Sequence, residues 1–214
     1  LKMEDLLKEA QELQHKIVEW RRILHRYPET GLVLPKTADF VTKQLTAAGI
    51  AYKTYKNHSG ITAVIGKGEG KTIAIRADMD GLPIKEETGL TYASANENMH
   101  ACGHDAHAAE LLATAKILWE LRSQFRGTVK LIFQPAEEYF PSGALAMMAG
   151  GDLDDCGAII GTHILTNLPV GKICVEAGGK MAASASVNIR VKGKGGHGGM
   201  PYQAVDAIVA AAAI

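Results

Sequence analysis

The sequence has few cysteines and no long apolar run. Only three of its 214 residues are cysteines, too few and too scattered for a disulfide framework. No apolar run approaches the ~20 residues that cross a bilayer, and the amino-terminal stretch is amphipathic and charged, unlike a signal peptide. A reducing, cytoplasmic setting without a membrane partner is therefore expected.

An excess of charge of either sign is also lacking. Lysine and arginine together number 23, as do aspartate and glutamate, so the formal net charge is zero. Nothing in this balance favours binding to nucleic acid or to an anionic membrane. Apolar residues make up 47% of the chain, which is ordinary for a globular protein with a buried core.

Apolar residues recur at helical spacing in some segments and in short β-branched runs in others. Helices are predicted at residues 3–26, 37–48 and 105–122. Strands are predicted at residues 52–55, 61–65, 72–76, 128–133 and 158–161. Alternation of short buried strands with helices predicts an α/β fold, a sheet covered by helices.

The pattern changes near residue 181. Residues 186–191 alternate as a strand with one buried face, a glycine-rich stretch follows, and an alanine-rich helix is predicted from Gln203 to Ile214. We expect residues 1–180 to form one domain and 181–214 to begin a smaller one. That helix has no cap or polar stop at Ile214, so we expect more chain to follow in the native protein.

Reactive side chains follow three of the predicted strands. Asp78 and Asp80 come after the strand at 72–76, Glu137 and Glu138 after 128–133, and His163 after 158–161. Ligands of open α/β sheets bind beyond the carboxyl ends of strands. Taken singly, each of these residues is more often structural, but their shared placement predicts a functional site.

A histidine-rich segment precedes the long helix. In Met99-His100-Ala101-Cys102-Gly103-His104-Asp105-Ala106-His107, the thiol of Cys102 and the imidazole of His104 lie close enough in sequence to bind one or two metal ions. Thiolate and imidazole suit zinc, and nearby carboxylates widen the choice to manganese, cobalt or nickel. Asp105 is predicted to cap the helix or to orient an imidazole. His15, His25 and His58 are interpreted as structural.

The consecutive carboxylates of Glu137 and Glu138 suggest a division of labour. One can ligate a metal while the other faces a metal-bound water as a general base, and later protonates a leaving amine. Such a site hydrolyses an amide without a serine or cysteine nucleophile.

Five motifs in order resemble the aminoacylase/carboxypeptidase superfamily of two-metal hydrolases. They are RADMDGLP, MHACGHDAH, FQPAEE, GTHI followed by LPVG, and GKGGHGGMP. They are most similar to the subgroup of hippurate, N-acetyl-diaminopimelate and indoleacetyl-amino-acid amidohydrolases. The resemblance implies a mixed sheet flanked by helices, as in zinc exopeptidases, in residues 1–180. It implies that residues 181–214 begin an α+β lid and dimerisation domain.

The resemblance also assigns roles to individual residues. It implies metal ligands at Cys102, His104, Glu138 and His163, with Glu137 as the base. Asp80 matches the aspartate that supports a metal-binding histidine, and Asp78 takes that histidine's place. His197 matches a lid histidine that reaches the active site of the partner subunit in a homodimer. The last histidine ligand of the family would lie beyond Ile214.

We therefore expect a metal-dependent amidohydrolase that holds two divalent ions (Zn, Mn, Co or Ni) and cleaves N-acyl-L-amino acids or related conjugates. Two alternatives stay open. The chain could be a non-catalytic or inactive fragment of such an enzyme. It could also be a cysteine-dependent amidase with Cys102 as the nucleophile and His104 or His163 as the base, although the adjacent glutamates have no role in that scheme.

Overall fold

One mixed sheet forms the centre of the first of two compact units, which ends at Asn167. The computed structural model describes residues 3–66, 70–183 and 185–214, and within these ranges five strands pair in the order β1-β2-β4-β3-β5. The strands are β1 (Tyr52–Thr54), β2 (Ile61–Gly66), β3 (Thr72–Asp78), β4 (Thr128–Gln134) and β5 (Cys156–Gly161). β1 pairs with β2, and β2 with β4, in antiparallel fashion, whereas β3 runs parallel to both β4 and β5. The carboxyl ends of β3, β4 and β5 therefore meet at one edge of the sheet.

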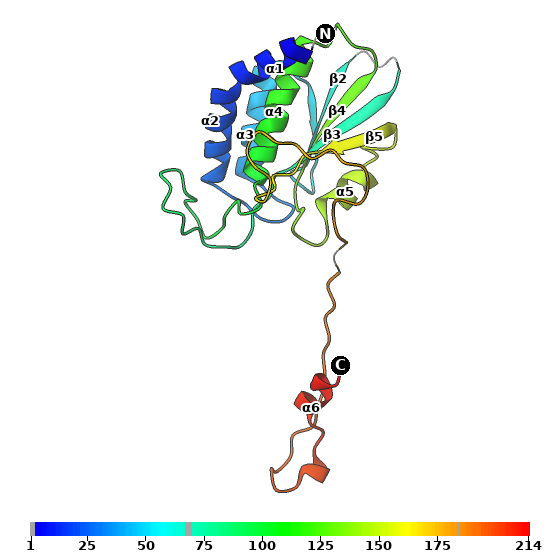
Figure 1. Cartoon of the computed structure of the whole chain (residues 1–214). Coiled ribbons are helices and arrows are strands. Elements are labelled where there is room, and N and C mark those ends of the chain that lie inside the picture. The colour runs from blue at the N-terminus through cyan, green and yellow to red at the C-terminus, as the bar shows by residue number, and fades with distance from the viewer. Residues whose placement is uncertain (1–2, 67–69, 184) are drawn as a thin grey trace. The chain divides into compact units, whose positions relative to one another are not determined.

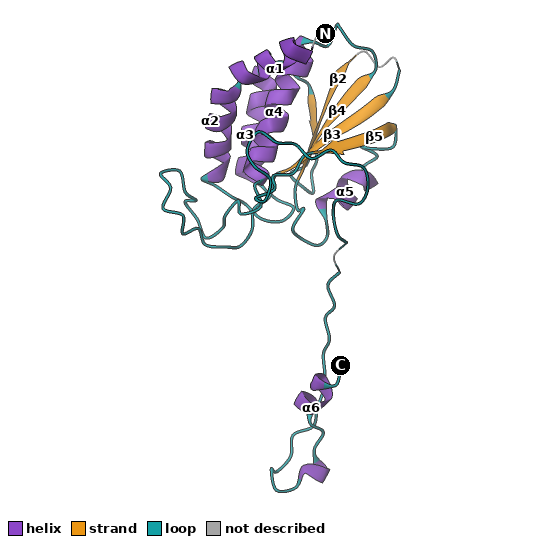
Figure 2. Cartoon of the chain, in the orientation of Figure 1, coloured by secondary structure: helices purple, strands orange, loops and turns teal. Residues whose placement is uncertain are grey.

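Helices cover the two faces of this sheet unequally (Figure 1). The larger layer contains α1 (Met3–Glu12), α2 (Gln14–His25), α3 (Pro35–Ala47) and α4 (His104–Glu120). The short helix α5 (Gly143–Ala149) packs on the opposite face, as Figure 2 shows. The predicted α/β fold and the mixed sheet flanked by helices are confirmed.

The side chains of β4 point alternately to the two faces of the sheet and pack on both. Leu131 and Phe133 are fully buried in the large core beneath the helices. Ile132 points to the other face, where it packs with Ala74 of β3 and Met147 of α5. Successive strand residues point to opposite sides, and burying an aliphatic or aromatic side chain of this size contributes about 1.5–3 kcal/mol. This packing fixes the strand ends that carry the polar residues.

Two details of the helices differ from the sequence-based expectation. The helix predicted at 3–26 is divided at Leu13 into α1 and α2, although no glycine or proline marks the break. Asp105 does not cap α4, because the helix begins at His104 and its N-cap is Gly103. Gly103 has a φ of 89°, a left-handed conformation that favours glycine.

Residues 168–214 form a separate compact unit. It contains the 3-10 turn η1 (Pro201–Gln203) and helix α6 (Ala207–Ala212). The helix begins later than predicted, because the Asp206 carboxylate caps it by accepting the N–H groups of Ile208 and Val209.

The strand predicted at 186–191 is wrong. This backbone is irregular, and Val187 and Ile189 are 78% and 61% exposed. An alternating segment becomes a strand only when a second strand satisfies its backbone groups. None does so in the described part of this unit, where one isolated bridge joins Lys194 and Val205. The division into domains at residue 180 and the lid identity of residues 181–214 stay predictions.

None of the helices in the described ranges combines the length and the apolar character needed to cross a bilayer.

Candidate metal centre

The carboxyl edge of β3, β4 and β5 gathers the residues that the sequence places after these strands. Asp78 ends β3, and the carboxylate of Asp80 follows two residues later. The Glu137–Glu138 pair follows β4, and His163 lies just beyond β5. His104 opens α4 at the same edge, since its ring lies 3.6 Å from Asp78 and 3.5 Å from Asp80.

Asp80 fixes the turn that presents the two glutamates. Its two carboxylate oxygens accept the backbone N–H groups of Glu137, at 3.0 Å, and of Glu138, at 3.1 Å. Hydrogen bonds to an ionised acceptor are roughly twice as strong as neutral ones. The turn closes at Gly143, where a Cβ atom would lie 1.8 Å from the carbonyl oxygen of Pro135. Asp80 therefore acts on the backbone, and both glutamates stay accessible, with the Glu138 side chain 25% exposed.

His104 is buried among carboxylates without a hydrogen bond. It is 1% exposed, and neither ring nitrogen has a hydrogen-bond partner. Its Nε2 lies 3.6 Å from Asp78 and 4.0 Å from Glu138. Burial lowers the pKa of His104, but the carboxylates of Asp80 and Asp78 outweigh burial and raise it. A buried imidazole with two unsatisfied nitrogens is costly, and a cation among these groups would satisfy it.

His107 shares a helix face with His104 but is fully hydrogen-bonded. Its Nδ1 lies 2.7 Å from Asp78, and its Nε2 accepts the backbone N–H of Ile164 at 3.0 Å. Burial would raise the pKa of Asp78, but the hydrogen bond from His107 and the charge of Arg76 lower it to about 2. Asp78, His104 and His107 form one possible ligand group, but His107 has no free nitrogen. It instead ties the end of β3 to the segment that carries His163.

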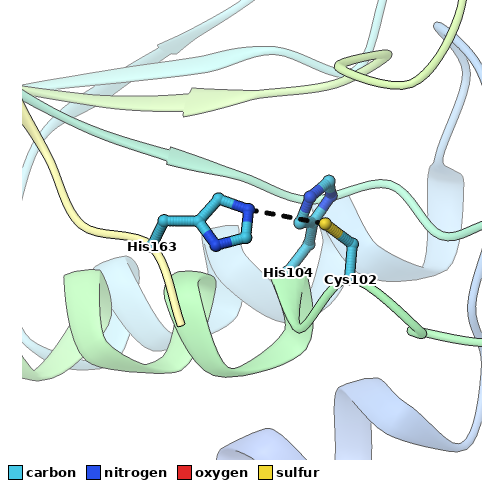
Figure 3. Close-up of side chains that lie close together, drawn as sticks. All are labelled: Cys102, His104 and His163. Carbon is cyan, nitrogen blue, oxygen red and sulfur yellow. Dashed lines mark hydrogen bonds between the residues drawn. The ribbon is translucent and has the colours of Figure 1, made fainter. Parts of the chain in front are cut away.

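Cys102 and His163 form the accessible side of the site. Figure 3 shows their side chains pointing toward one another beside His104, with 3.4 Å between Cys102 Sγ and His163 Nε2. The Nδ1 of His163 lies 2.7 Å from the carbonyl oxygen of Ile164. Because a carbonyl only accepts, Nδ1 carries the hydrogen, and Nε2 keeps a lone pair directed at the thiol. A lone pair in this position is what a metal ligand requires.

Besides the group with Asp78 and His107, two further groups of potential ligands share His104. One consists of Cys102, His104 and His163, the other of His104, Glu137 and Glu138. In each group one ligand atom per residue lies within 4.8 Å of the others. The donors are sulfur, nitrogen and oxygen, the set that borderline divalent ions prefer. The unsatisfied nitrogens of His104 and the free lone pair of His163 therefore fit metal binding.

The thiol of Cys102 is not activated as a nucleophile. Burial, followed by the nearby carboxylate of Glu138, raises the pKa of the Cys102 thiol to about 12. Reactive cysteines have lowered pKa values because a cation or helix terminus stabilises the thiolate. The surrounding acids favour instead a thiol that ionises when it binds a metal cation. Burial and the charge of Glu138 also raise the pKa of Glu137, as suits a proton carrier.

Two histidines outside these groups bear on the predictions: His197, which the resemblance assigns to the site, and His25, which is not assigned to it. His197 belongs to the unit of residues 168–214 and is exposed there, so its predicted role stays a prediction. His25, interpreted from the sequence as structural, is buried and hydrogen-bonded to Asp105 and Glu86. Asp105 therefore contacts the imidazole of His25 and not that of a predicted metal ligand, so its predicted role as the partner of a metal-bound imidazole stays a prediction. A cavity of 770 Å³ is lined by His25, Glu86 and Asp105 together with Cys102 and His163.

Known proteins are similar to this chain in sequence. The sequence profile of "Peptidase family M20/M25/M40" matches residues 74–213. An N-acyl-L-amino acid amidohydrolase from Geobacillus stearothermophilus is 44% identical over 213 residues, covering 99% of this chain and 58% of that protein. The chain spans about half the length of the curated relatives that it matches.

Solved structures agree with the fold. A protein from methicillin-resistant Staphylococcus aureus has a TM-score of 0.83 and 37% identity, over 99% of this chain and 57% of that chain. A Bacillus subtilis protein described as a dinuclear metal-binding peptidase of the M20 family has a TM-score of 0.71 and 38% identity. That match covers 75% of this chain and 46% of the other.

Proposed function

We propose that this chain, which belongs to peptidase family M20/M25/M40, is the metal-binding part of an amidohydrolase that cleaves the amide bond of N-acyl-L-amino acids or related conjugates. The name of the Geobacillus stearothermophilus relative supports this substrate class. Because the chain spans about half of such relatives, the activity is proposed for the protein of which these residues form a part.

The observation that carries the proposal is the pair of ligand groups that share His104 at the ends of three neighbouring strands. We assign Cys102, His104, Glu138 and His163 as the residues that hold two divalent ions. Zinc, manganese, cobalt and nickel suit these donors. When bound, such ions polarise a substrate carbonyl and lower the pKa of water.

The remaining residues would move a proton and keep the site in shape. Glu137 would take the proton from the attacking water and deliver it to the leaving amine as the carbon–nitrogen bond breaks. Its raised pKa supports this role. Asp80 would hold the Glu137–Glu138 turn through the two backbone hydrogen bonds.

We further propose that His197 contacts the substrate carbonyl across a homodimer formed by the lid domain. This part rests on the resemblance of the GKGGHGGMP motif alone. The free thiols of Cys102, Cys156 and Cys174 support a reducing, cytoplasmic setting.

The direct test is the amount of metal bound per chain, measured by elemental analysis on protein purified without added metal or chelator. We expect about two equivalents of a transition metal. Cys102→Ala and Glu138→Ala should each lower this content, while Cys156→Ala, which removes another half-buried thiol, should not. Absence of metal from the chain and from a longer protein containing it would refute the two-metal mechanism.

A second measurement separates ligands from the proton carrier. Glu137→Gln keeps the size of the side chain but cannot take a proton. In the longer protein we expect unchanged metal content and turnover of N-acyl amino acids lowered by ~10²–10⁴-fold. Inactivation by a thiol reagent without sensitivity to chelators would instead favour the cysteine-dependent amidase.

A further inference from the structure

His25 lies between two buried carboxylates. It is the last residue of α2 and is 2% exposed. Its Nδ1 lies 2.7 Å from Asp105 Oδ2, and its Nε2 lies 3.2 Å from Glu86 Oε1. Ionised carboxylates only accept hydrogen bonds, so both ring nitrogens must carry hydrogen and the ring is an imidazolium. The hydrogen bond with Asp105 raises the pKa of His25 by more than burial lowers it.

The two carboxylates belong to segments on either side of Cys102 and His104. Asp105 directly follows His104 in the first turn of α4. Glu86 lies in the loop of residues 82–99, whose ends are joined by paired backbone hydrogen bonds of Leu82 with Met99 at 2.9 and 3.0 Å. Within that loop, Glu86 accepts the backbone N–H of Ser94 at 2.6 Å. The loop ends three residues before Cys102.

The side chain of His25 therefore links the segment that leads into Cys102 with the turn that begins at His104. We infer that His25 is a positioning residue for the candidate metal site, which sets the spacing of Cys102 and His104 by holding Asp105 and Glu86 together. The ligand roles of Cys102 and His104 rest on the proposed function. The bridge itself rests on the hydrogen bonds of His25 alone.

Arg21 makes a parallel and more exposed link. Its Nε lies 2.7 Å from Asp105, and its guanidinium donates to the hydroxyl of Tyr92, in the same loop, at 3.3 Å. This contact keeps Asp105 paired with a cation when His25 is replaced. A His25 variant should therefore fold, and its loss of function can be separated from unfolding.

The first experiment compares the zinc affinity of the full chain with that of His25→Asn and Glu86→Gln, by competition with a chromophoric chelator. Loss of a partner that orients metal ligands costs 10–100-fold in affinity. We expect a loss of about that size for His25→Asn and a smaller one for Glu86→Gln, which keeps the shape of the side chain. The thiolate absorption band of the Co²⁺-loaded chain should also shift in His25→Asn.

Two variants serve as controls. His15→Asn removes an exposed histidine from the same helix. Arg26→Ala removes a contact between α2 and the loop carbonyl of Thr91 without touching Asp105. Both should leave zinc affinity and the cobalt spectrum unchanged. A lower melting temperature for His25→Asn with unchanged affinity and spectrum would show a merely structural role and overturn the inference.

A metal-free readout keeps this inference separate from the proposed function. Amide hydrogen exchange of the metal-free chain reports local opening of the first turn of α4. We expect His25→Asn to speed exchange at residues 105–107 about tenfold or more, since a hydrogen bond between charged groups contributes at least that factor. Exchange in β4 should not change.

The outcomes distinguish the two ideas. A wild-type chain that binds no metal counts against the proposed function, while faster exchange confined to the start of α4 would still support the bridge. Unchanged exchange at residues 105–107 would overturn the bridge even if the chain binds two metal ions.

Discussion

His104 and Asp105 are neighbours in the first turn of α4, and both are 1% exposed, yet they lie in opposite kinds of surroundings. The Oδ2 atom of Asp105 meets His25 and Arg21, each at 2.7 Å. Both nitrogens of His104 lack a hydrogen-bond partner, and the nearest carboxylate oxygens are 3.5 and 3.6 Å away.

The difference separates a group that stabilises the fold from one that is open to a ligand. Removing one partner of a buried ion pair is strongly destabilising. Removing His104 should cost less, because its imidazole makes only ion-pair contacts with Asp80 and Asp78, at 3.5 and 3.6 Å, and has no hydrogen bond to lose. Substitution of Asp105 should therefore mainly lower the free energy of unfolding. Substitution of His104 should mainly weaken metal binding.

The largest loss of stability is expected for Asp105→Asn. This change removes the charge that pairs with both His25 and Arg21, and breaking a buried pair costs about 3–5 kcal/mol. Urea unfolding of the metal-free chain measures it. The matched control is Asp39→Asn on the surface of α3, where an exposed pair with Lys43 contributes less than ~1 kcal/mol. Equal effects of the two substitutions would contradict the comparison.

A smaller loss is expected for Asp80→Asn. The amide nitrogen of asparagine cannot accept the N–H of Glu137 or Glu138, so one of the two backbone hydrogen bonds is lost. A hydrogen bond to a charged group contributes about 1.5–3 kcal/mol, and the same unfolding measurement applies. Metal content should fall as well, since Glu138 is no longer held. If Asp80→Ala and wild type prove equally stable, Asp80 does not hold the turn.

The bridge of His25 should make stability depend on pH. The pKa of His25 is raised in the folded chain, chiefly by its hydrogen bond with Asp105. Its contribution is therefore fully present below the unfolded value of 6.5 and is lost as pH rises through the folded value. The charged and titratable groups facing it are Arg21, Glu86, Tyr92, His100 and Asp105.

Melting temperatures of wild type and His25→Asn from pH 6 to pH 9 measure this effect. The difference between the two proteins should shrink as pH rises. A difference that does not vary with pH would mean that the ring is not an imidazolium in the folded chain.

The smallest effect on stability is expected for His104→Leu. Leucine fills a similar volume, and the imidazole makes ion-pair contacts with Asp80 and Asp78 but has no hydrogen bond to lose, so the metal-free chain should lose less stability than it does with Asp80→Asn, about 1 kcal/mol. Metal binding, measured by calorimetric titration, should nevertheless be abolished, because His104 belongs to both ligand groups. A destabilisation as large as that of Asp105→Asn would show that His104 and Asp105 contribute equally to stability, which would contradict the comparison.

Much of the fold follows from local patterns. The five strands and the long helix were predicted within two or three residues, because β-branched runs and helical apolar spacing are properties of the chain itself. The strand predicted at 186–191 failed because a strand needs a partner, and none pairs with it in the described part of its unit. An alternating pattern shows that a segment favours an extended backbone, but a strand forms only where a second strand pairs with it.

The sequence predicted which residues make up the candidate site but not which hydrogen bonds they make. Strand-end placement pointed to Asp80, Glu138 and His163, and the structure brings them to one edge. The role of His107 was missed, although its spacing from His104 was a signal, because only the fold shows that the N–H of Ile164 occupies its Nε2.

By itself the sequence determined which residue types stand at the ends of the strands, because side-chain chemistry and strand propensity are local. The tertiary structure alone decided which of the buried histidines are satisfied. His107 and His25 are held by carboxylates and by a backbone amide from distant segments, while His104 is left without hydrogen bonds between Asp78 and Asp80. Satisfaction of a buried polar group depends on partners tens of residues away, and the packing of helices on the sheet brings those partners together.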